Sequence, residues 1–282
     1  MISYEIFVGI VQERITEYLP AWFGEYKVKI DKKHKINQER DFLTIAPTKE
    51  KGSTFVCPAI PLSEVYTAFG EEQDMESLLH YLADIIVNNF AQFNDQDLVM
   101  DFVANKDKIV MNIVNTEKNK ELLEGLPHRD ILDFSIIYRF IMQREGNGYG
   151  TVVLNNSIMD EINLEENELF DMALENTRRL FPMNMKNMGE MFYIISNSHG
   201  LHGSAYIAHS DVLGEMYDKV KGNYYIIPTS LHEFVVVGIR YISLLAAKDM
   251  LIESMREVCH EGEFLSDNIY YYDGRENQLK IA

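Results

Sequence analysis

The chain has 282 residues and a formal net charge of −18, with 46% hydrophobic and 25% charged residues. This length predicts one large domain or two small ones, and a core that needs neither disulfides nor metals. The acidic charge argues against nucleic acid as a partner, because that binding relies on Lys and Arg at phosphates. One stretch differs: residues 27–51 hold eight basic and four acidic residues. They are expected to be the solvated faces of a strand pair or a docking patch for an acidic partner.

The cysteine content and the apolar pattern bear on the compartment. The two cysteines, Cys57 and Cys259, lie far apart in sequence, and each is expected to pack as a small hydrophobic residue. The first residues carry acids where a secretory signal has positive charge. No apolar run reaches the roughly 18 residues that a membrane span needs. These features predict a reduced, cytoplasmic protein that is not bound to a membrane.

The first half of the sequence predicts helices around a small antiparallel sheet. Apolar residues at helical spacing predict a helix over residues 4–18, which Pro20 ends. Three short β-prone segments follow at 25–36, 40–47 and 53–60 and predict a meander. Helices are expected at 74–90 and 97–105, and a strand at 108–115. Thr116 is expected to cap the next helix, with Gly125 in the left-handed position after it and Pro127 blocking its continuation.

The second half is richer in strands. The segments 131–143 and 149–155 flank the turn sequence Arg-Glu-Gly-Asn-Gly and predict a hairpin. Helices are expected at 165–180, 210–222 and 243–262, strands at 190–198, 203–209, 224–230 and 233–239, and a last hairpin over 268–281. Because hairpins outnumber strand–helix–strand units, the prediction is an α+β fold of mostly antiparallel sheets flanked by amphipathic helices. We expect two regions, 1–125 and 126–282.

Several sequence segments resemble those of a known family. In order, these are residues 115–140, 166–182, 191–209, 224–239 and 265–273. They resemble a family of uncharacterised bacterial proteins with a Ser-Xaa-His-Glu step and a C-terminal Leu-Ser-Asp-Xaa-Val-Tyr-Tyr-Tyr-Asp-like ending. Here the step is Ser230, His232 and Glu233, and Ile269 replaces the usual valine of the ending. The resemblance covers roughly residues 105 to 275 well and the N-terminal third more loosely. It implies a bacterial, cytoplasmic protein and no catalytic residue, because the family has no assigned activity.

The Ser-Xaa-His-Glu step is the first candidate for chemistry. A nucleophile and its base must come within about 2.6–3.2 Å, and a third group must orient the base. Neighbouring residues on one strand rarely meet this requirement, and the chain has no Gly-Xaa-Ser-Xaa-Gly elbow. We therefore expect Ser230, His232 and Glu233 to form a turn after Pro228. A ligand-binding or metal role and a hydrolase triad are the alternatives.

The histidines form the second candidate. A zinc or manganese site needs three or four ligands that converge at about 2.0–2.3 Å. His199, His202 and His209 are close in sequence, and strand pairing can bring His232 to them. Glu233 or Asp211 is a candidate to complete a three-histidine site. The spacing matches no helical zinc motif, so exposed loop histidines with one packed histidine are the competing interpretation.

For each of these motifs, a structural role explains the residues better than a catalytic or metal-binding role. We therefore expect a protein-binding or regulatory module that works without catalysis or a cofactor and has an unidentified protein partner. One alternative is a metal-dependent hydrolase that uses the group His199, His202, His209, His232 and Glu233. Another is an acidic decoy that mimics the charge of DNA.

Overall fold

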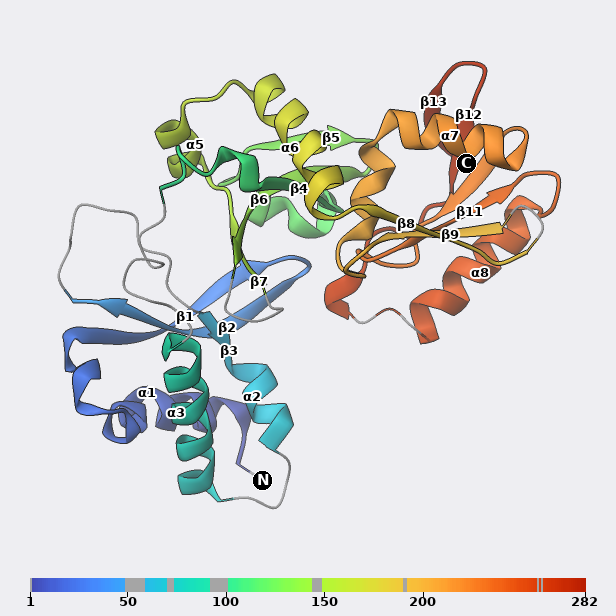
Figure 1. Ribbon diagram of the computed structural model, residues 1–282. Helices are drawn as coiled ribbons and strands as arrows, with labels where there is room; N and C mark the ends of the chain where they lie inside the picture. Colours follow the sequence, from blue (N-terminus) through green and yellow to red (C-terminus); the bar gives the residue numbers. More distant parts are fainter. Residues whose placement is uncertain are drawn as a thin grey trace. The chain divides into compact units, whose positions relative to one another are not determined.

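The computed structural model describes residues 2–48, 59–69, 74–91, 101–143, 149–189, 192–257, 259 and 261–282. The chain forms two compact units, Met1–Asp101 with Gln143–Gly150, and Phe102–Met142 with Thr151–Ala282. The predicted division between residues 125 and 126 falls between α4 (Lys120–Leu123) and β5 (His128–Ile131), within the second unit. The architecture is α+β with antiparallel sheets, as the sequence predicts (Figure 1).

The first unit packs helices against one face of a three-stranded sheet. The expected meander is present in the order β1-β2-β3, with antiparallel pairs. Val28 and Ile30 of β1 pack with Leu43 and Ile45 of β2 against the buried side of the helices. The elements are α1 (Tyr4–Arg14), η1 (Ile15–Tyr18), η2 (Ala21–Glu25), β1 (Tyr26–Lys35), β2 (Gln38–Pro47), β3 (Ala59–Pro61), α2 (Leu62–Phe69) and α3 (Met75–Ala91).

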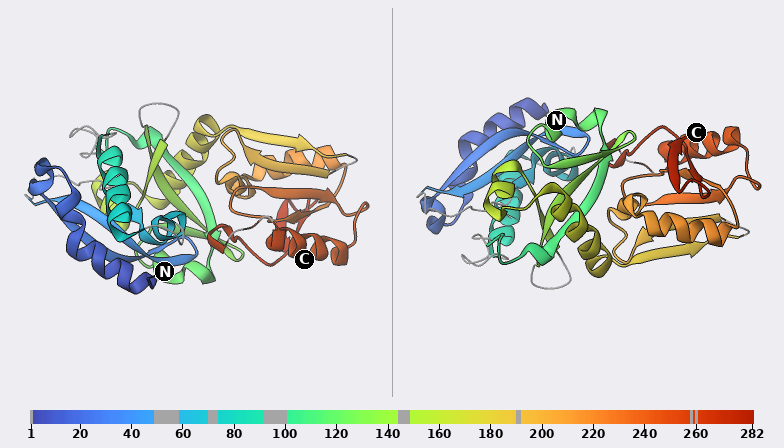
Figure 2. Two further views of the ribbon diagram at one scale, coloured as in Figure 1. Left: turned by 90° about the horizontal axis from the view of Figure 1, so that it is seen from below. Right: turned by 90° about the horizontal axis from the view of Figure 1, so that it is seen from above.

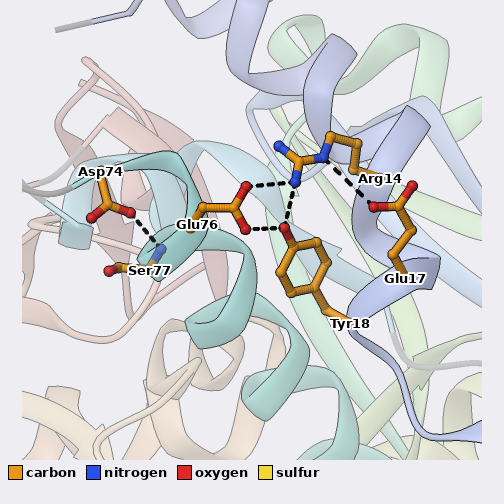
Figure 3. Close-up of polar contacts among 6 residues, drawn as sticks. All are labelled: Arg14, Glu17, Tyr18, Asp74, Glu76 and Ser77. Atoms are coloured by element: carbon orange, nitrogen blue, oxygen red, sulfur yellow. Dashed lines mark hydrogen bonds and ion pairs between the residues drawn. The ribbon is translucent and has the colours of Figure 1, made fainter.

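Polar contacts at the helix ends fix the first unit. Asp74 caps α3, because its Oδ1 accepts a hydrogen bond from the Ser77 amide at 2.8 Å. At the same helix start, Glu76 accepts a hydrogen bond from Arg14 Nη2 at 2.5 Å, and it also accepts one from the Tyr18 hydroxyl (Figure 3). These bonds lower the pKa of the Glu76 carboxyl and join the first helical segment to α3.

The second unit contains two antiparallel sheets. The smaller sheet has the order β4-β6-β5, and β7 also pairs with β6. Its elements are η3 (Lys106–Lys108), β4 (Ile109–Asn115), η4 (Glu117–Asn119), α4, β5, β6 (Phe134–Gln143), β7 (Tyr149–Val153), α5 (Asn156–Ile162) and α6 (Glu166–Leu180). The larger sheet has the order β13-β12-β10-β11-β9-β8. Its elements are β8 (Met183–Asn187), β9 (Phe192–Asn197), η5 (Gly203–Ala208), α7 (Ser210–Val220), β10 (Tyr224–Ile227), β11 (Phe234–Gly238), α8 (Leu244–Glu257), η6 (Glu261–Glu263), β12 (Tyr270–Asp273) and β13 (Gln278–Ile281).

Helices α7 and α8 cover opposite faces of the larger sheet (Figure 1 and Figure 2). Ala247 and Leu251 of α8 pack against Val235 and Val237 of β11. Neighbouring residues on a strand point to opposite faces. Accordingly, the Tyr224 hydroxyl of β10 turns the other way and donates to the Leu213 carbonyl of α7 at 2.8 Å.

Three local predictions are wrong. Of the strand expected at residues 203–209, Gly203–Ala208 forms a 3₁₀ helix, because Gly203 lies against the backbone of another loop. Thr116 does not cap the following helix; the Asn115 side chain accepts from the Lys118 amide at 2.9 Å, and Thr116 bonds to Ser135. Gly125 does not adopt the left-handed conformation, since the short α4 ends in a series of turns.

Other differences concern elements that the sequence pattern did not reveal. The strands β5 and β8 and the helix α5 were not expected, because they are short and have weak apolar periodicity. Part of the helix predicted at 97–105, part of the third meander strand and the whole predicted turn at 144–148 lie outside the described residues. The three consecutive tyrosines of β12 alternate as the side chains of a strand do, because Tyr270 and Tyr272 are buried and Tyr271 is half-buried.

Candidate functional site

The Ser-Xaa-His-Glu step forms the connection between β10 and β11. The Ser230 amide and the Thr229 hydroxyl both donate to the Glu233 carbonyl, at 3.3 and 2.9 Å. The Ser230 hydroxyl oxygen accepts from the His232 amide at 3.0 Å. A serine that accepts from an amide two residues later is a recognised turn device. Ser230 is 5% exposed and contacts the backbone of His232 here, and strand β11 begins only at Phe234.

The ring of His232 joins two other loops. Its Nδ1 accepts a hydrogen bond from the His202 amide at 3.1 Å. Its Nε2 lies 3.3 Å from Oε1 of Glu263. Since Nδ1 acts as an acceptor, the ring proton of neutral His232 is on Nε2 and faces the carboxylate. We call His202, His232 and Glu263 the histidine junction.

Close backbone packing supports the histidine junction. The Ser196 hydroxyl donates to the His232 carbonyl at 2.7 Å, and the Ser204 hydroxyl donates to the Ser230 carbonyl at 2.7 Å. Gly203 lies between them: a Cβ there would be 2.5 Å from the His232 carbonyl oxygen and 2.6 Å from Ser196 Cα. Only a residue without a side chain allows this approach. The loop that contains Gly203 and the loop that contains Ser230 and His232 therefore pack directly against each other.

His202 is neutral in this environment. Its backbone is left-handed, with φ of 56°, and its Nδ1 is buried with no hydrogen-bond partner in the described structure. Burial lowers the pKa of His202 to about 3, and the neighbouring Arg139 and His232 act in the same direction. Its ring meets that of His232 edge to face, with 5.5 Å between centroids.

The other candidate metal ligands lie elsewhere. His209 is fully buried at the start of α7, and its Nδ1 accepts from Arg178 Nε at 3.1 Å. Burial, reinforced by the Arg178 charge, lowers the pKa of His209 to about 4. His199 is exposed and contacts the Phe181 ring, and the interactions of Glu233 given above involve its backbone carbonyl.

The predicted metal set is therefore only partly assembled. The structure brings His202 and His232 together and adds Glu263, which the sequence did not point out. Across the described ranges, no group of three or more His, Cys, Asp or Glu side chains is arranged to hold a metal ion. This geometry does not support the metal centre that the sequence predicted. That centre used His199, His202, His209, His232 and Glu233, and it stays a prediction.

The C-terminal motif makes a second buried network that the sequence did not reveal. Asp133, in the turn between β5 and β6, accepts hydrogen bonds from Ser266 at 2.7 Å, Asn268 at 3.1 Å and the Tyr270 hydroxyl at 2.5 Å. We call these four residues the Asp133 clasp. Burial and the Asp133 carboxylate raise the pKa of Tyr270, so the hydroxyl remains a donor. The clasp ties the larger sheet to the smaller one, which gives the motif a structural role. The only signal in the sequence was the motif itself, because its partner lies more than 130 residues away.

Comparison with known proteins gives the family but no activity. Among the described helices, none has the length and apolar character needed to cross a bilayer. Comparisons with curated proteins and with solved structures gave no match. One family model, described as a family of unknown function (DUF5688), matches residues 4–192 and 189–274. These matches span most of both units, so the chain belongs to the DUF5688 family, whose function is unknown.

Proposed function

We propose that this protein acts by binding a protein partner through one face of α8 and catalyses no reaction. The observation that carries the proposal is a group of exposed apolar side chains on and beside this helix, which we call the α8 surface. Leu245 is 71% exposed and Ile252 is 54% exposed, and in the turn before the helix Tyr241 is 44% and Ile239 is 41% exposed. Grouped exposed apolar residues of this size are typical of interaction sites.

Helix geometry places the two most exposed residues together. Leu245 and Ile252 are seven residues apart, which is about two turns, so they lie on the same side of α8. The opposite side holds Ala247 and Leu251, which are already buried against the sheet. The outer side therefore has no role in the core of the unit, and its exposure to water carries a cost that a partner would relieve.

Charges of both signs surround the α8 surface. Lys248, Asp249, Glu253 and Arg256 are all exposed on the same helix. An apolar centre with a mixed polar rim is the usual composition of a protein–protein interface. A membrane is a poorer match, because interfacial helices place mainly Lys and Arg around their apolar face.

The histidine junction favours a structural over a catalytic role for the family-like motif. Both ring nitrogens of His232 already have partners, the His202 amide and the Glu263 carboxylate. A general base needs a ring nitrogen that can reach the substrate. Binding is thus a better account of the chain than hydrolysis. We also propose a cytoplasmic location; two cysteines in 282 residues are in keeping with a compartment in which thiols stay reduced.

Site-specific photo-crosslinking in cells tests the proposal. A benzophenone amino acid replaces Leu245 in one variant and Val103 in another; Val103 is 50% exposed and belongs to the same unit. We expect a discrete crosslinked protein from position 245 that disappears when Ile252→Asp is added, and none from position 103. A second copy of the chain as the captured protein would also support binding. Equal capture at both positions, or none at 245, would refute the proposal.

A further inference from the structure

The first unit carries a strongly basic strand at a sheet edge. β1 pairs with β2 and with no other described strand. Five of its ten residues are lysines, although the whole chain has a net charge of −18. Of these, Lys27, Lys29 and Lys32 are exposed and Lys33 is half-buried. We call these four lysines the basic edge.

The lysines of the basic edge make no ion pair with an acidic side chain in the part of the chain that the structure describes. Nearby basic side chains do have acidic neighbours: Arg40 contacts Glu64 at 2.6 Å, and His34 lies 3.6 Å from Glu39. The strand register explains this for two of the four lysines. Lys27 and Lys29 lie opposite Ala46 and Thr44, which are uncharged, whereas Lys32 lies opposite Asp41. No cross-strand carboxylate therefore neutralises this end of the hairpin.

We propose that the basic edge binds an extended acidic segment of a protein partner, which adds as a strand beside β1. An edge strand offers backbone hydrogen-bonding groups that such a segment can pair with. Alternate side chains of a strand lie about 6.6–6.8 Å apart on one face. Lys27 and Lys29 share a face, so acidic residues at every second position of the segment lie within reach of them.

The lysines of the basic edge also determine which peptide segments can pair with β1. Lysine on an edge strand opposes pairing with neutral or basic strands, and this protects proteins from aggregation. An acidic strand is the one kind that converts the same charges into attraction. This inference rests on the proposed function, which is binding of a protein partner. The basic edge lies in the first unit and the α8 surface in the second, so either proposal can fail without the other.

Fluorescence anisotropy with a labelled peptide tests the inference. The probe is an end-capped decapeptide of alternating Glu and Thr, measured at low salt with the full-length protein. The variant K27E/K29E reverses two lysines of the basic edge. The matched control, K120E/K221E, makes the same change in charge at two exposed lysines of the second unit that lie outside the α8 surface. Fluorescence of Trp22, the single tryptophan of the chain, reports whether the first unit is folded in each variant.

We expect saturable binding that K27E/K29E weakens about tenfold or more and that K120E/K221E leaves within about twofold. A peptide with N-methylated amides keeps its charge but cannot pair with a strand edge, and it should bind at least as weakly as the probe binds K27E/K29E. Three results would overturn the inference: no binding to the wild type, equal loss in both variants, or undiminished binding of the methylated peptide. Tighter binding of single-stranded DNA of equal charge would also overturn it, since that indicates general polyanion attraction.

Discussion

Replacing Gly203 by alanine tests how the histidine junction is held together. The new Cβ would lie 2.5 Å from the His232 carbonyl oxygen, 2.6 Å from Ser196 Cα and 2.7 Å from Ser196 Oγ. Ordinary contacts of a Cβ are 3.4–4 Å. Two of the three neighbours are backbone atoms, which cannot escape by rotating a side chain. The two loops must therefore separate.

The expected loss of stability follows from two contributions. Overpacking of a filled site costs about 1–3 kcal/mol. Separation also weakens the bond from Ser196 Oγ to the His232 carbonyl and the bond from the His202 amide to the His232 ring, at about 1 kcal/mol each. We expect Gly203→Ala to lower the free energy of unfolding of the second unit by about 3–5 kcal/mol.

Urea denaturation followed by circular dichroism measures the loss, and hydrogen exchange of peptides covering 196–206 and 230–234 locates it. The control is Gly214→Ala inside α7, where an added Cβ meets no atom within 4 Å. There, alanine should stabilise by about 0.5–1 kcal/mol, because glycine is a poor helix former. A change below about 0.5 kcal/mol for Gly203→Ala, within the range of ordinary surface substitutions, would refute the close packing of the two loops.

Two further predictions concern buried polar groups. Tyr270→Phe removes the hydroxyl that donates to Asp133, which should cost about 1.5–3 kcal/mol in urea denaturation; Tyr225→Phe, whose hydroxyl makes no hydrogen bond in the described structure, should change little. An equal effect of the two substitutions would contradict a stabilising role of the Asp133 clasp. His209 has a pKa of about 4 when folded and about 6.5 when unfolded, so only the unfolded state gains its proton between these values, and stability falls as the pH falls. From pH 7.5 to pH 5 this should cost about 2 kcal/mol, and His209→Gln should remove that part of the pH dependence measured by urea denaturation. A variant that stays as pH-sensitive as the wild type would show that His209 is not the group responsible.

The helices and strands with strong periodicity were predictable from sequence. The 3.6-residue pattern located α3, α6 and α8, and the turn-bounded β-prone segments located β1, β2, β10 and β11. These signals are local, because each element buries one face and therefore repeats its apolar residues at its own period. Residues 203–208 failed this rule, since a contact with a distant loop set their backbone conformation.

The candidate site was only partly predictable. The sequence pointed to His202 and His232, but not to Glu263, and it grouped with them two histidines that lie elsewhere. Spacing along the chain does not reveal which loops meet, so the partner of His232 came from a segment 31 residues away. The role of Asp133 could not be predicted for the same reason, because its partners are 133 to 137 residues away in the sequence.

The sequence by itself determined the α+β class, the antiparallel hairpins, the acidic charge and the basic segment of β1. These depend on composition and local periodicity, which are complete in the chain before it folds. Only the tertiary structure decided that Ser230 contacts a backbone amide, that both ring nitrogens of His232 are occupied, and that Leu245 and Ile252 remain exposed. Each of these depends on which distant segments pack together, and packing selects among loop and surface arrangements that the local sequence permits equally.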